Sequence, residues 1–340
     1  MKEIAAACGV SVATVSKALS GHRDIGEKTK AQVREMADKM GYLPNLSARY
    51  LKTNRSYNIG VLFEDAAHSG LTHDFFAGVL ENLKITAESK GYDITFLNTS
   101  STDMPYVERA LYRGFDGVVI ACSDFSDPKV QELLQSSVKV VTVDYIADNR
   151  TAVVSDNTDG MTQLMNYILN QGHRKIAYIH GDNNRVTKQR LASYYRAMRQ
   201  CGEQLPADYV QPGLYRDRQL ACEKTELLLS MKEPPTCILY PDDVAAYGGM
   251  NAIHARGLRV PEDISVAGYD GIRALQYNEP RLTTIRQDTE SLGRLAAESL
   301  IEEIEQPMIA APTIHTVKSV LLEGQTVLNC LQNVIAGHPA

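Results

Sequence analysis

Strand-like and helix-like stretches alternate along residues 57–340, and this alternation restricts the fold more than any other feature of the sequence. Strand-like runs occur at residues 58–63, 92–97, 117–121, 138–144, 175–179, 236–240 and 264–268. Several helical stretches between them end at a glycine in the position that follows a helix, namely Gly91, Gly172, Gly202 and Gly257. This order predicts the α/β class, with parallel sheets covered by helices. About 280 residues exceed one such sheet, so we expect two similar lobes with a ligand between them.

The charge of the chain is divided unevenly between its first 56 residues and the rest. The whole chain of 340 residues carries a formal net charge of -6, which argues against an indiscriminate nucleic-acid binder. Residues 1–56, however, contain ten basic and five acidic residues, whereas residues 57–340 contain 25 basic and 36 acidic ones. A small basic head on a larger acidic body predicts an anionic partner for the head alone.

The six cysteines show no spacing typical of metal ligands, so we expect no metal site and interpret them as reduced, buried thiols. The N-terminus has no leader of basic and then apolar residues, and no run approaches the roughly 20 apolar residues that span a bilayer. We therefore expect a cytoplasmic protein with no membrane partner.

Residues 8–19 predict a tight turn followed by a short helix whose outer face suits a DNA groove. Ser11 is a good N-cap because its hydroxyl accepts from the free backbone N–H groups of the first turn, and Gly9 permits the turn before it. The positions expected to face inward are Val10, Val15 and Leu19. The positions expected to face outward or to lie on the flank are Val12, Ala13, Thr14, Ser16 and Lys17. An outer face of small and hydrogen-bonding residues is what a groove-entering helix needs.

Two further helices complete a predicted helix-turn-helix head over residues 1–43. Residues 2–7 form the first helix, and residues 27–40 form the third. In the third helix, Val33, Met36, Ala37 and Met40 recur at helical spacing and predict one apolar stripe, which Gly41 ends. The alternative is a small helical cap that serves only packing. The turn spacing, the capped second helix and the local charge favour the head.

Several motifs make the chain similar to a known family. The head contains GVSVATVSKALSG at 9–21, followed by GYLPN at 41–45, ARYL at 48–51 and IGV at 59–61. Further motifs are DNTDG at 156–160, GHRKIA at 172–177, VPEDISVAGYD at 260–270 and LTTIRQ at 282–287. The chain resembles the LacI/GalR family of bacterial transcription regulators over nearly its whole length. It departs from the usual pattern in having almost no residues ahead of the first helix.

The resemblance implies which residues contact DNA. It places base-edge contacts at Val12, Ala13 and Lys17. The residues nearer the phosphates are Ser11, Thr14, Ser16, His22 and Arg23. Because Val12 and Ala13 offer only apolar contact, such as to a thymine methyl group, we expect readout there by shape.

Residues 44–52 resemble the family's hinge helix, and residues 53–56 form a polar linker. The expected domains are a head (1–43), a hinge and linker (44–56) and a core (57–340). A helix of about two turns is too short to be stable alone in water, and should order only with DNA or with a partner copy. Leu51 matches the family leucine that wedges into the minor groove and kinks the DNA. The alternative is that Leu46 and Leu51 bury against each other across a dimer.

The core resembles the periplasmic sugar-binding proteins, which implies two Rossmann-like lobes joined by crossovers near residues 153–156, 285–288 and 316–320. Arg190 and Asp270 match the family's effector-binding arginine and aspartate, and such a pair can bracket a polyol or sugar. Asp242 stands where many relatives have Asn. Further positions that map to the pocket are Asp144, Ser155 and Gln287, with Phe75 and Tyr215 as candidate aromatic walls. His73 is either a ligand contact or a solvated loop histidine.

Motifs typical of enzymes are missing, including G-x-S-x-G, H-E-x-x-H and G-x-G-x-x-G. The adjacent Asp242 and Asp243 are better explained as a helix start than as an acid/base pair. We therefore predict a repressor rather than an enzyme, without a cofactor. It should bind a pseudo-palindromic double-stranded operator as a homodimer under the control of a small-molecule effector, a carbohydrate or its phosphate. The alternatives are a ligand-binding protein that has lost DNA recognition, and an enzyme built on the lobed core.

Overall fold

The computed structural model describes residues 1–19, 22, 24–42, 55–65, 69–97, 104–202 and 206–331. The chain separates into two compact units, Met1–Ser56 and Tyr57–Ala340. We call them the head and the core unit and describe each by itself.

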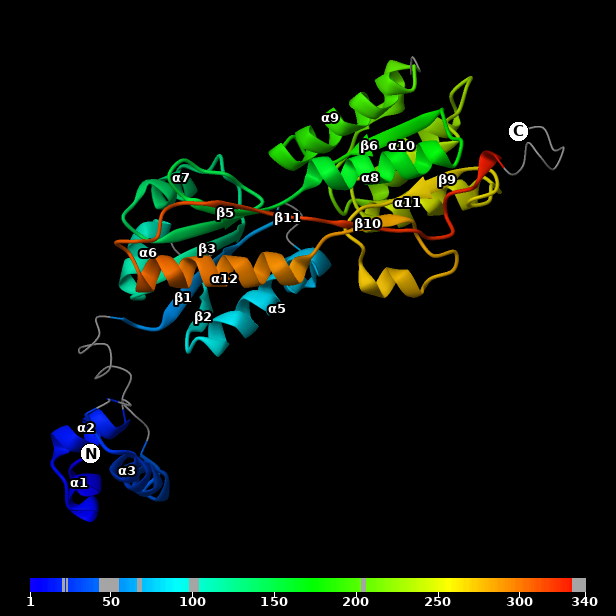
Figure 1. Cartoon of the computed structure of the whole chain (residues 1–340). Helices are drawn as coiled ribbons and strands as arrows, with labels where there is room; N and C mark the ends of the chain where they lie inside the picture. Colours follow the sequence, from blue (N-terminus) through cyan, green and yellow to red (C-terminus); the bar gives the residue numbers. More distant parts are fainter. Residues whose placement is uncertain are drawn as a thin grey trace. The chain divides into compact units, whose positions relative to one another are not determined.

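The described part of the head contains three helices, α1 (Lys2–Cys8), α2 (Val12–Leu19) and α3 (Glu27–Lys39) (Figure 1). The Thr14 backbone N–H donates to Ser11 Oγ at 3.0 Å, so Ser11 caps α2 as predicted. The small hydrophobic core consists of Ile4, Ala5, Cys8, Val15, Ala18, Val33 and Ala37. Met40 is exposed rather than part of the apolar stripe, because α3 ends at Lys39 and Met40 lies in the following turn.

The first lobe of the core unit contains a six-stranded sheet with the strand order β11-β5-β4-β3-β1-β2, parallel throughout. Its strands are β1 (Asn58–Phe63), β2 (Asp93–Phe96), β3 (Gly117–Cys122), β4 (Val140–Val143), β5 (Thr151–Ser155) and β11 (Ile314–Val317). One hydrophobic cluster joins it to α5 (Asp74–Ser89) and α12 (Thr289–Glu305), and another to α6 (Tyr106–Tyr112) and α7 (Pro128–Gln135). Side chains alternate between the two clusters along β1 and β3, since successive strand residues point to opposite faces.

The second lobe contains a four-stranded parallel sheet with the order β7-β6-β8-β9. Its strands are β6 (Ile176–His180), β7 (Val210–Pro212), β8 (Cys237–Leu239) and β9 (Ser265–Ala267). Helices α8 (Asn157–Asn170) and α9 (Arg185–Gln200) share one hydrophobic cluster with it, and α10 (Arg218–Leu229) and α11 (Asp243–Ala255) share another. Within the described ranges, the short 3-10 helices η2 (Ala207–Tyr209) and η3 (Arg273–Tyr277) belong to the second lobe, and η1 (Gly70–Thr72) belongs to the first.

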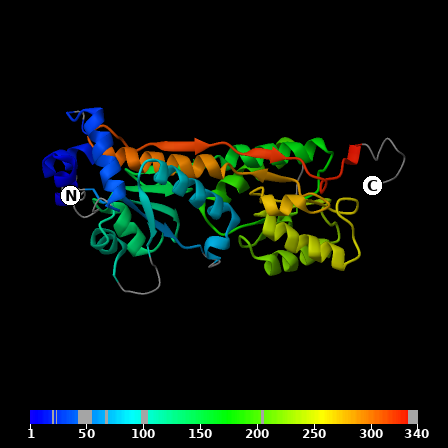
Figure 2. The same ribbon diagram turned by 90° about the horizontal axis from the view of Figure 1, so that it is seen from below.

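The chain crosses between the lobes three times. It passes from β5 to α8, returns from β10 (Thr284–Arg286) to α12, and passes again from β11 to β12 (Val320–Leu322). Strands β10 and β12 pair in antiparallel fashion, and β11 and β12 run from one lobe to the other in Figure 2. The crossovers fall at the predicted places. All seven predicted strands are present with small changes in their bounds, whereas β5, β7, β10, β11 and β12 were not predicted as strands.

Among the helices of the described residues, none combines the length and the hydropathy that a membrane crossing requires. The four glycines predicted to follow helices, Gly91, Gly172, Gly202 and Gly257, all have positive φ.

Candidate DNA-reading helix and effector site

Helix α2 presents the residues that were predicted to read DNA. Ser11, Val12, Ala13 and Lys17 are exposed, and Thr14 and Ser16 are half-buried. With 43% of its surface exposed, Val12 is a large apolar residue that the head leaves in solvent. Val15, by contrast, is completely buried, so the two faces of α2 separate a core role from a surface role.

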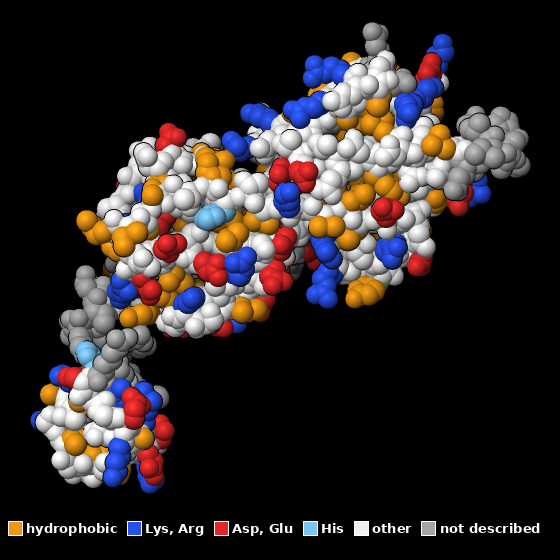
Figure 3. Space-filling view, in the orientation of Figure 1, with side chains coloured by type: hydrophobic (Ala, Val, Ile, Leu, Met, Phe, Trp, Pro, Cys, Tyr) orange, Lys and Arg blue, Asp and Glu red, His pale blue; other side chains and the backbone are white. Residues whose placement is uncertain are grey.

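Polar side chains on this surface already have partners. Lys17 Nζ forms an ion pair with the Asp24 carboxylate, and the hydrogen bond from Lys17 lowers the pKa of Asp24. Ser11 Oγ lies 2.8 Å from Thr14 Oγ1 in addition to its capping bond. A contact between Lys17 and DNA therefore either uses another N–H of the Lys17 ammonium or replaces the bond to Asp24. Figure 3 shows basic and acidic side chains side by side on the visible face of the head.

His22, predicted to lie near the phosphates, is exposed. Arg23, Leu46 and Leu51, together with the hinge over residues 44–52, lie outside the described residues.

Arg190 on α9 is the centre of a polar cluster in the second lobe. Its Nε donates to Asn157 Oδ1 at 2.9 Å and its Nη1 donates to the Pro241 carbonyl oxygen at 2.9 Å. Its guanidinium carbon lies 3.4 Å from the centre of the Tyr269 ring, a stacked cation–π geometry. Burial lowers the pKa of Arg190, whereas Tyr215, Tyr269 and other neighbours raise it. The effect of these neighbours is the larger one, so the pKa lies above its ordinary value. Arg190 is thus a fixed, charged donor with only 2% of its surface exposed.

Asp270 and Gln287 stand beside this arginine. Gln287 Nε2 donates to Asp270 Oδ1 at 2.7 Å, and Asp270 has a left-handed φ of 103°. Gln287 Oε1 and the Tyr269 hydroxyl are buried and have no hydrogen-bond partner within the described ranges. An unpaired buried polar group costs about 1–3 kcal/mol, so such atoms mark places where a ligand gains affinity.

His73 brings a third unpaired polar atom to the site, from the first lobe. It precedes α5 with only 8% of its surface exposed, and its Nδ1 lacks a hydrogen-bond partner in the described part of the chain. The interpretation of His73 as a solvated loop histidine is therefore wrong. Burial lowers the pKa of His73, and the nearby Asp270 of the other lobe opposes this shift. Its ring contacts Phe76 edge-on, with 4.7 Å between ring centres, whereas Phe75 belongs to the hydrophobic core of the first lobe.

Asp144 and Ser155 come together at the carboxyl ends of β4 and β5. Asp144 Oδ1 accepts from the Ser155 backbone N–H at 2.7 Å, and Oδ2 accepts from Ser155 Oγ at 3.4 Å. Burial raises the pKa of Asp144, although the bonds from Ser155 and the charge of Arg190 oppose the shift. The first lobe therefore adds a carboxylate within the electrostatic reach of Arg190.

Asp242 has both carboxylate oxygens engaged by backbone groups. Oδ1 caps α11 by accepting from the Ala245 N–H at 2.8 Å, and Oδ2 accepts from the Arg216 N–H at 2.6 Å. Asp243 behaves similarly, accepting from the Ile272 N–H and from Thr284 Oγ1. Asp242 therefore caps α11 as predicted, whereas Asp243, the first residue of α11, bonds to Ile272 and Thr284 outside the helix. Burial raises the pKa of Asp242 to about 6.

The shift at Asp242 predicts a pH-dependent stability. Its folded pKa, about 6, lies above the ordinary value of 3.8, so the folded state binds this proton more tightly. The contribution is fully present below about pH 4 and is lost as the pH rises through 6, a change of about 2–3 kcal/mol. Asp242→Asn retains a capping oxygen but does not titrate. The free energy of unfolding in urea, compared between wild type and Asp242→Asn from pH 4 to 7, should therefore differ in slope; parallel curves would contradict this.

Tyr215 and Arg216 follow each other in the loop before α10. The Tyr215 hydroxyl lies 2.8 Å from Thr187 Oγ1, and its ring lies 5.9 Å from the Arg190 guanidinium carbon. Arg216 Nη1 donates to Asp74 Oδ2 at 3.1 Å and Nη2 donates to the Thr72 carbonyl at 3.3 Å. Since Asp74 belongs to the first lobe and Arg216 to the second, this ion pair links the lobes.

Sequence reasoning missed several residues of the site. Asn157, Tyr269 and Phe76 lie within or beside motifs that were recognised, but their roles depend on contacts that no spacing encodes. Arg216 and Asp74 are 142 residues apart and carry no local signal of their pairing. Among the residues that the structure describes, no three or more His, Cys, Asp or Glu side chains form a cluster that could hold a metal ion.

Comparison with known proteins identifies both units. Residues 1–45 match the family described as bacterial regulatory proteins, lacI family, and residues 165–327 match the periplasmic binding protein-like domain. A probable HTH-type transcriptional repressor, ExuR, of Bacillus subtilis (strain 168) is 31% identical over 318 residues, covering 92% of this chain and 94% of that protein. The HTH-type transcriptional repressor CytR of Escherichia coli (strain K12) is 28% identical, covering 90% of this chain and 89% of that protein.

Solved structures share the fold. The lac repressor dimer bound to operator and the anti-inducer ONPF superposes with a TM-score of 0.78 at 24% identity, covering 96% of this chain and 98% of that chain. The transcriptional regulator CelR in complex with cellobiose gives a TM-score of 0.70 at 23% identity, covering 95% and 98%. The helix-turn-helix head, the two-lobed core and the 31% identity over nearly the whole chain agree. The protein belongs to the LacI family of bacterial regulatory proteins and is a DNA-binding transcriptional regulator.

Proposed function

We propose that this regulator is a homodimeric repressor of a pseudo-palindromic operator, controlled by a neutral carbohydrate that binds between the lobes around Arg190. The observation that carries the effector class is the set of unpaired buried polar atoms on His73, Tyr269 and Gln287. Hydroxyl groups of a sugar both donate and accept, so they can satisfy an imidazole nitrogen, a phenol and an amide oxygen together.

The charges around this site favour a neutral effector over an anionic one. Asp144 and Asp270 interact electrostatically with Arg190, and Asp242 interacts with Asp270 and with Tyr215. Carboxylates accept hydrogen bonds from sugar hydroxyls, but they repel a phosphate or carboxylate. The Tyr215 and Tyr269 rings provide apolar faces beside these polar groups.

Control of DNA binding would follow from the contacts between the lobes. An effector that touches His73 from the first lobe and Asp270 from the second binds one lobe arrangement better than another, and shifts the population toward it. The ion pair between Asp74 and Arg216 stabilises the same arrangement. The hinge over residues 44–52 would order or release in response. In the head, Val12, Ala13 and Lys17 would then contact base edges.

The proposal is tested by footprinting and calorimetry with the full chain. DNA upstream of its own gene should show a two-fold symmetric protected site, with an affinity that falls steeply as salt rises. Affinity independent of both DNA sequence and salt would contradict the repressor. Calorimetry with a panel of neutral monosaccharides and disaccharides should detect one that binds and that changes operator affinity; a panel without any binder would contradict the effector class.

The ion pair between the lobes gives a smaller, separate prediction. Asp74→Asn should weaken binding of the sugar found in that panel by a factor of about two to five, because a partly exposed ion pair contributes about 0.5–1 kcal/mol. Glu298→Gln is a matched control, since Glu298 pairs with Arg294 within a single helix of one lobe. Equal effects of the two variants in calorimetry would show that the Asp74 pair does not stabilise the sugar-binding arrangement.

A further inference from the structure

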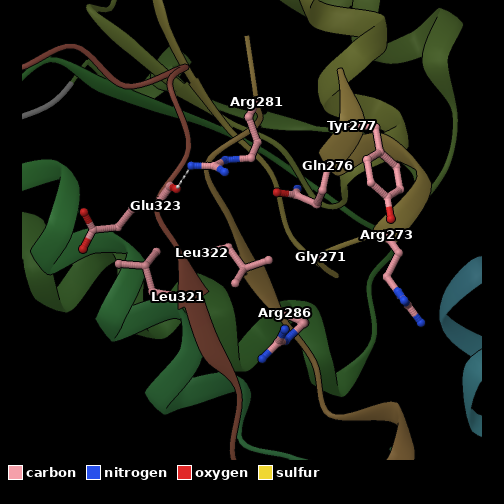
Figure 4. A pocket seen from close by; sticks show the side chains of 9 residues that line it. All are labelled: Gly271, Arg273, Gln276, Tyr277, Arg281, Arg286, Leu321, Leu322 and Glu323. Atoms are coloured by element: carbon pink, nitrogen blue, oxygen red, sulfur yellow. Dashed lines mark hydrogen bonds between the residues drawn. The ribbon is translucent and has the colours of Figure 1, made fainter. Parts of the chain in front are cut away.

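A cavity of about 430 Å³ lies in the second lobe, against the pair of strands β10 and β12 (Figure 4). Three arginines line it, Arg273 from η3, Arg281 from the loop before β10, and Arg286 at the end of β10. Leu321, Leu322 and Tyr277 add apolar surface, and 81% of the Tyr277 surface is exposed. Its lining residues are distinct from those of the site around Arg190.

Few acidic groups balance the positive charge of this cavity. Arg273, Arg281 and Arg286 are all exposed, and none of them forms an ion pair within the described ranges. Glu323 is the acidic residue of the lining, but Arg281 Nη2 donates to its backbone carbonyl at 3.4 Å rather than to its carboxylate. Residues 57–340 as a whole carry 36 acidic and 25 basic residues. Three gathered arginines are therefore a local exception in an acidic unit.

We propose that this cavity, which we call the arginine pocket, binds a small molecule with two or more oxyanion groups, phosphate or carboxylate. A guanidinium group offers a planar pair of N–H donors that matches the oxygens of phosphate and carboxylate. Three like charges in one hollow repel each other, and a multivalent anion relieves that repulsion. The leucines and Tyr277 can cover the apolar part of such a ligand.

The arginine pocket shares its backbone with the proposed effector site, which gives the bound anion a route to regulation. Gly271 follows Asp270 and Arg286 precedes Gln287, and the Asp270 N–H donates to the Ile285 carbonyl at 2.8 Å. The two segments are in close contact, since a Cβ on Gly271 would lie 2.6 Å from the Arg286 Cα. An anion that fixes Arg286 therefore acts on the paired Asp270 and Gln287 side chains. This coupling, unlike the anion binding, rests on the proposed function.

Calorimetry with the full chain, without DNA or sugar, tests the binding directly. Pyrophosphate, citrate and inorganic phosphate are titrated at constant ionic strength into wild type, Arg281→Gln, Arg286→Gln and Arg196→Gln. Arg196 is a matched control because it is an exposed arginine on α9 outside the pocket. At least one of the two multivalent anions should bind more tightly than phosphate. Each pocket variant should weaken it about tenfold or more, as expected for loss of a charge-assisted hydrogen bond, with Arg196→Gln unchanged.

Other outcomes overturn the proposal. Absence of binding by all three anions at millimolar concentration would do so, as would an equal loss in Arg196→Gln, which indicates diffuse attraction only. If the pocket variants instead change only the sedimentation of the protein, the arginines pair with a second copy of the chain rather than with a small anion. Thermal unfolding confirms that each variant is folded. Because the titration contains no sugar, a failed effector proposal leaves this result unaffected.

Discussion

Replacing Arg190 with Met should raise the dissociation constant of the sugar effector by about a hundredfold or more. The guanidinium is fixed by Asn157, the Pro241 carbonyl and the Tyr269 ring, so it presents its remaining donor positions in one direction. A ligand loses about 1.5–3 kcal/mol with each charge-assisted hydrogen bond. In Arg190→Met, the Asp144 and Asp270 carboxylates also lose the positive charge of the guanidinium beside them. Calorimetry with the sugar that binds wild type measures the change.

Two further variants test whether the loss depends on the guanidinium group at position 190. Arg190→Lys keeps the charge but lacks the planar fork. All donors of an ammonium lie on one atom, so they cannot reproduce the separate bonds from Nε to Asn157 and from Nη1 to Pro241, and we expect a loss of about tenfold or more. Arg196→Met removes an exposed arginine from the same helix and should leave sugar affinity unchanged. Thermal unfolding controls for stability, because Arg190→Met leaves Asn157 and Pro241 without a partner. Wild-type affinity in Arg190→Met would place the effector elsewhere.

Much of the fold could be predicted because its signals are local. Each of the seven predicted strands is an apolar run between helical stretches, and glycines such as Gly172 and Gly257 adopt the left-handed backbone that ends a helix. The Ser11 cap depends only on a neighbour three residues away. Among the strands that were missed, β7 and β10 have three residues each and contain polar residues, whereas the equally short β8 lies within an apolar run.

The site was harder to predict because its geometry depends on contacts distant in sequence. The resemblance indicated Arg190 and Asp270, but the partners that orient Arg190 lie 33 and 51 residues away. Phe75 and Phe76 are adjacent in sequence, and only the packing of α5 decides which ring enters the core. The arginine pocket was also not anticipated, since Arg273, Arg281 and Arg286 read individually as ordinary surface charges.

The proposed effector site around Arg190 and the arginine pocket differ in the charge of the ligand that they suit. Asp144 and Asp270 act electrostatically on Arg190, which suits the neutral, hydroxyl-rich ligand that we propose there, whereas the arginine pocket suits an anion. If both ligands bind, the backbone link from Gly271 to Asp270 makes the coupling between them reciprocal: the anion changes sugar affinity by the same factor as the sugar changes anion affinity.

The matched substitutions Val12→Ser and Val15→Ser should separate the two faces of α2. Val15 is fully buried in a small core, so a hydroxyl there leaves a polar group without a partner and costs about 3 kcal/mol, enough to unfold the head. Binding to both operator and unrelated DNA should then be lost. Val12 is exposed, so Val12→Ser should leave the head folded and remove only an apolar base contact.

Fluorescence anisotropy with operator and scrambled duplexes, at one fixed salt concentration, measures both effects. For Val12→Ser we expect operator affinity to fall about tenfold, because one base contact contributes about 1–3 kcal/mol of discrimination, with unchanged affinity for scrambled DNA. Sugar binding should stay at the wild-type level in both variants, since the head and the core unit are separate compact units. Equal loss of operator binding in the two variants, with the Val12→Ser head still folded by NMR, would mean that Val12 supports DNA binding in general and does not read sequence.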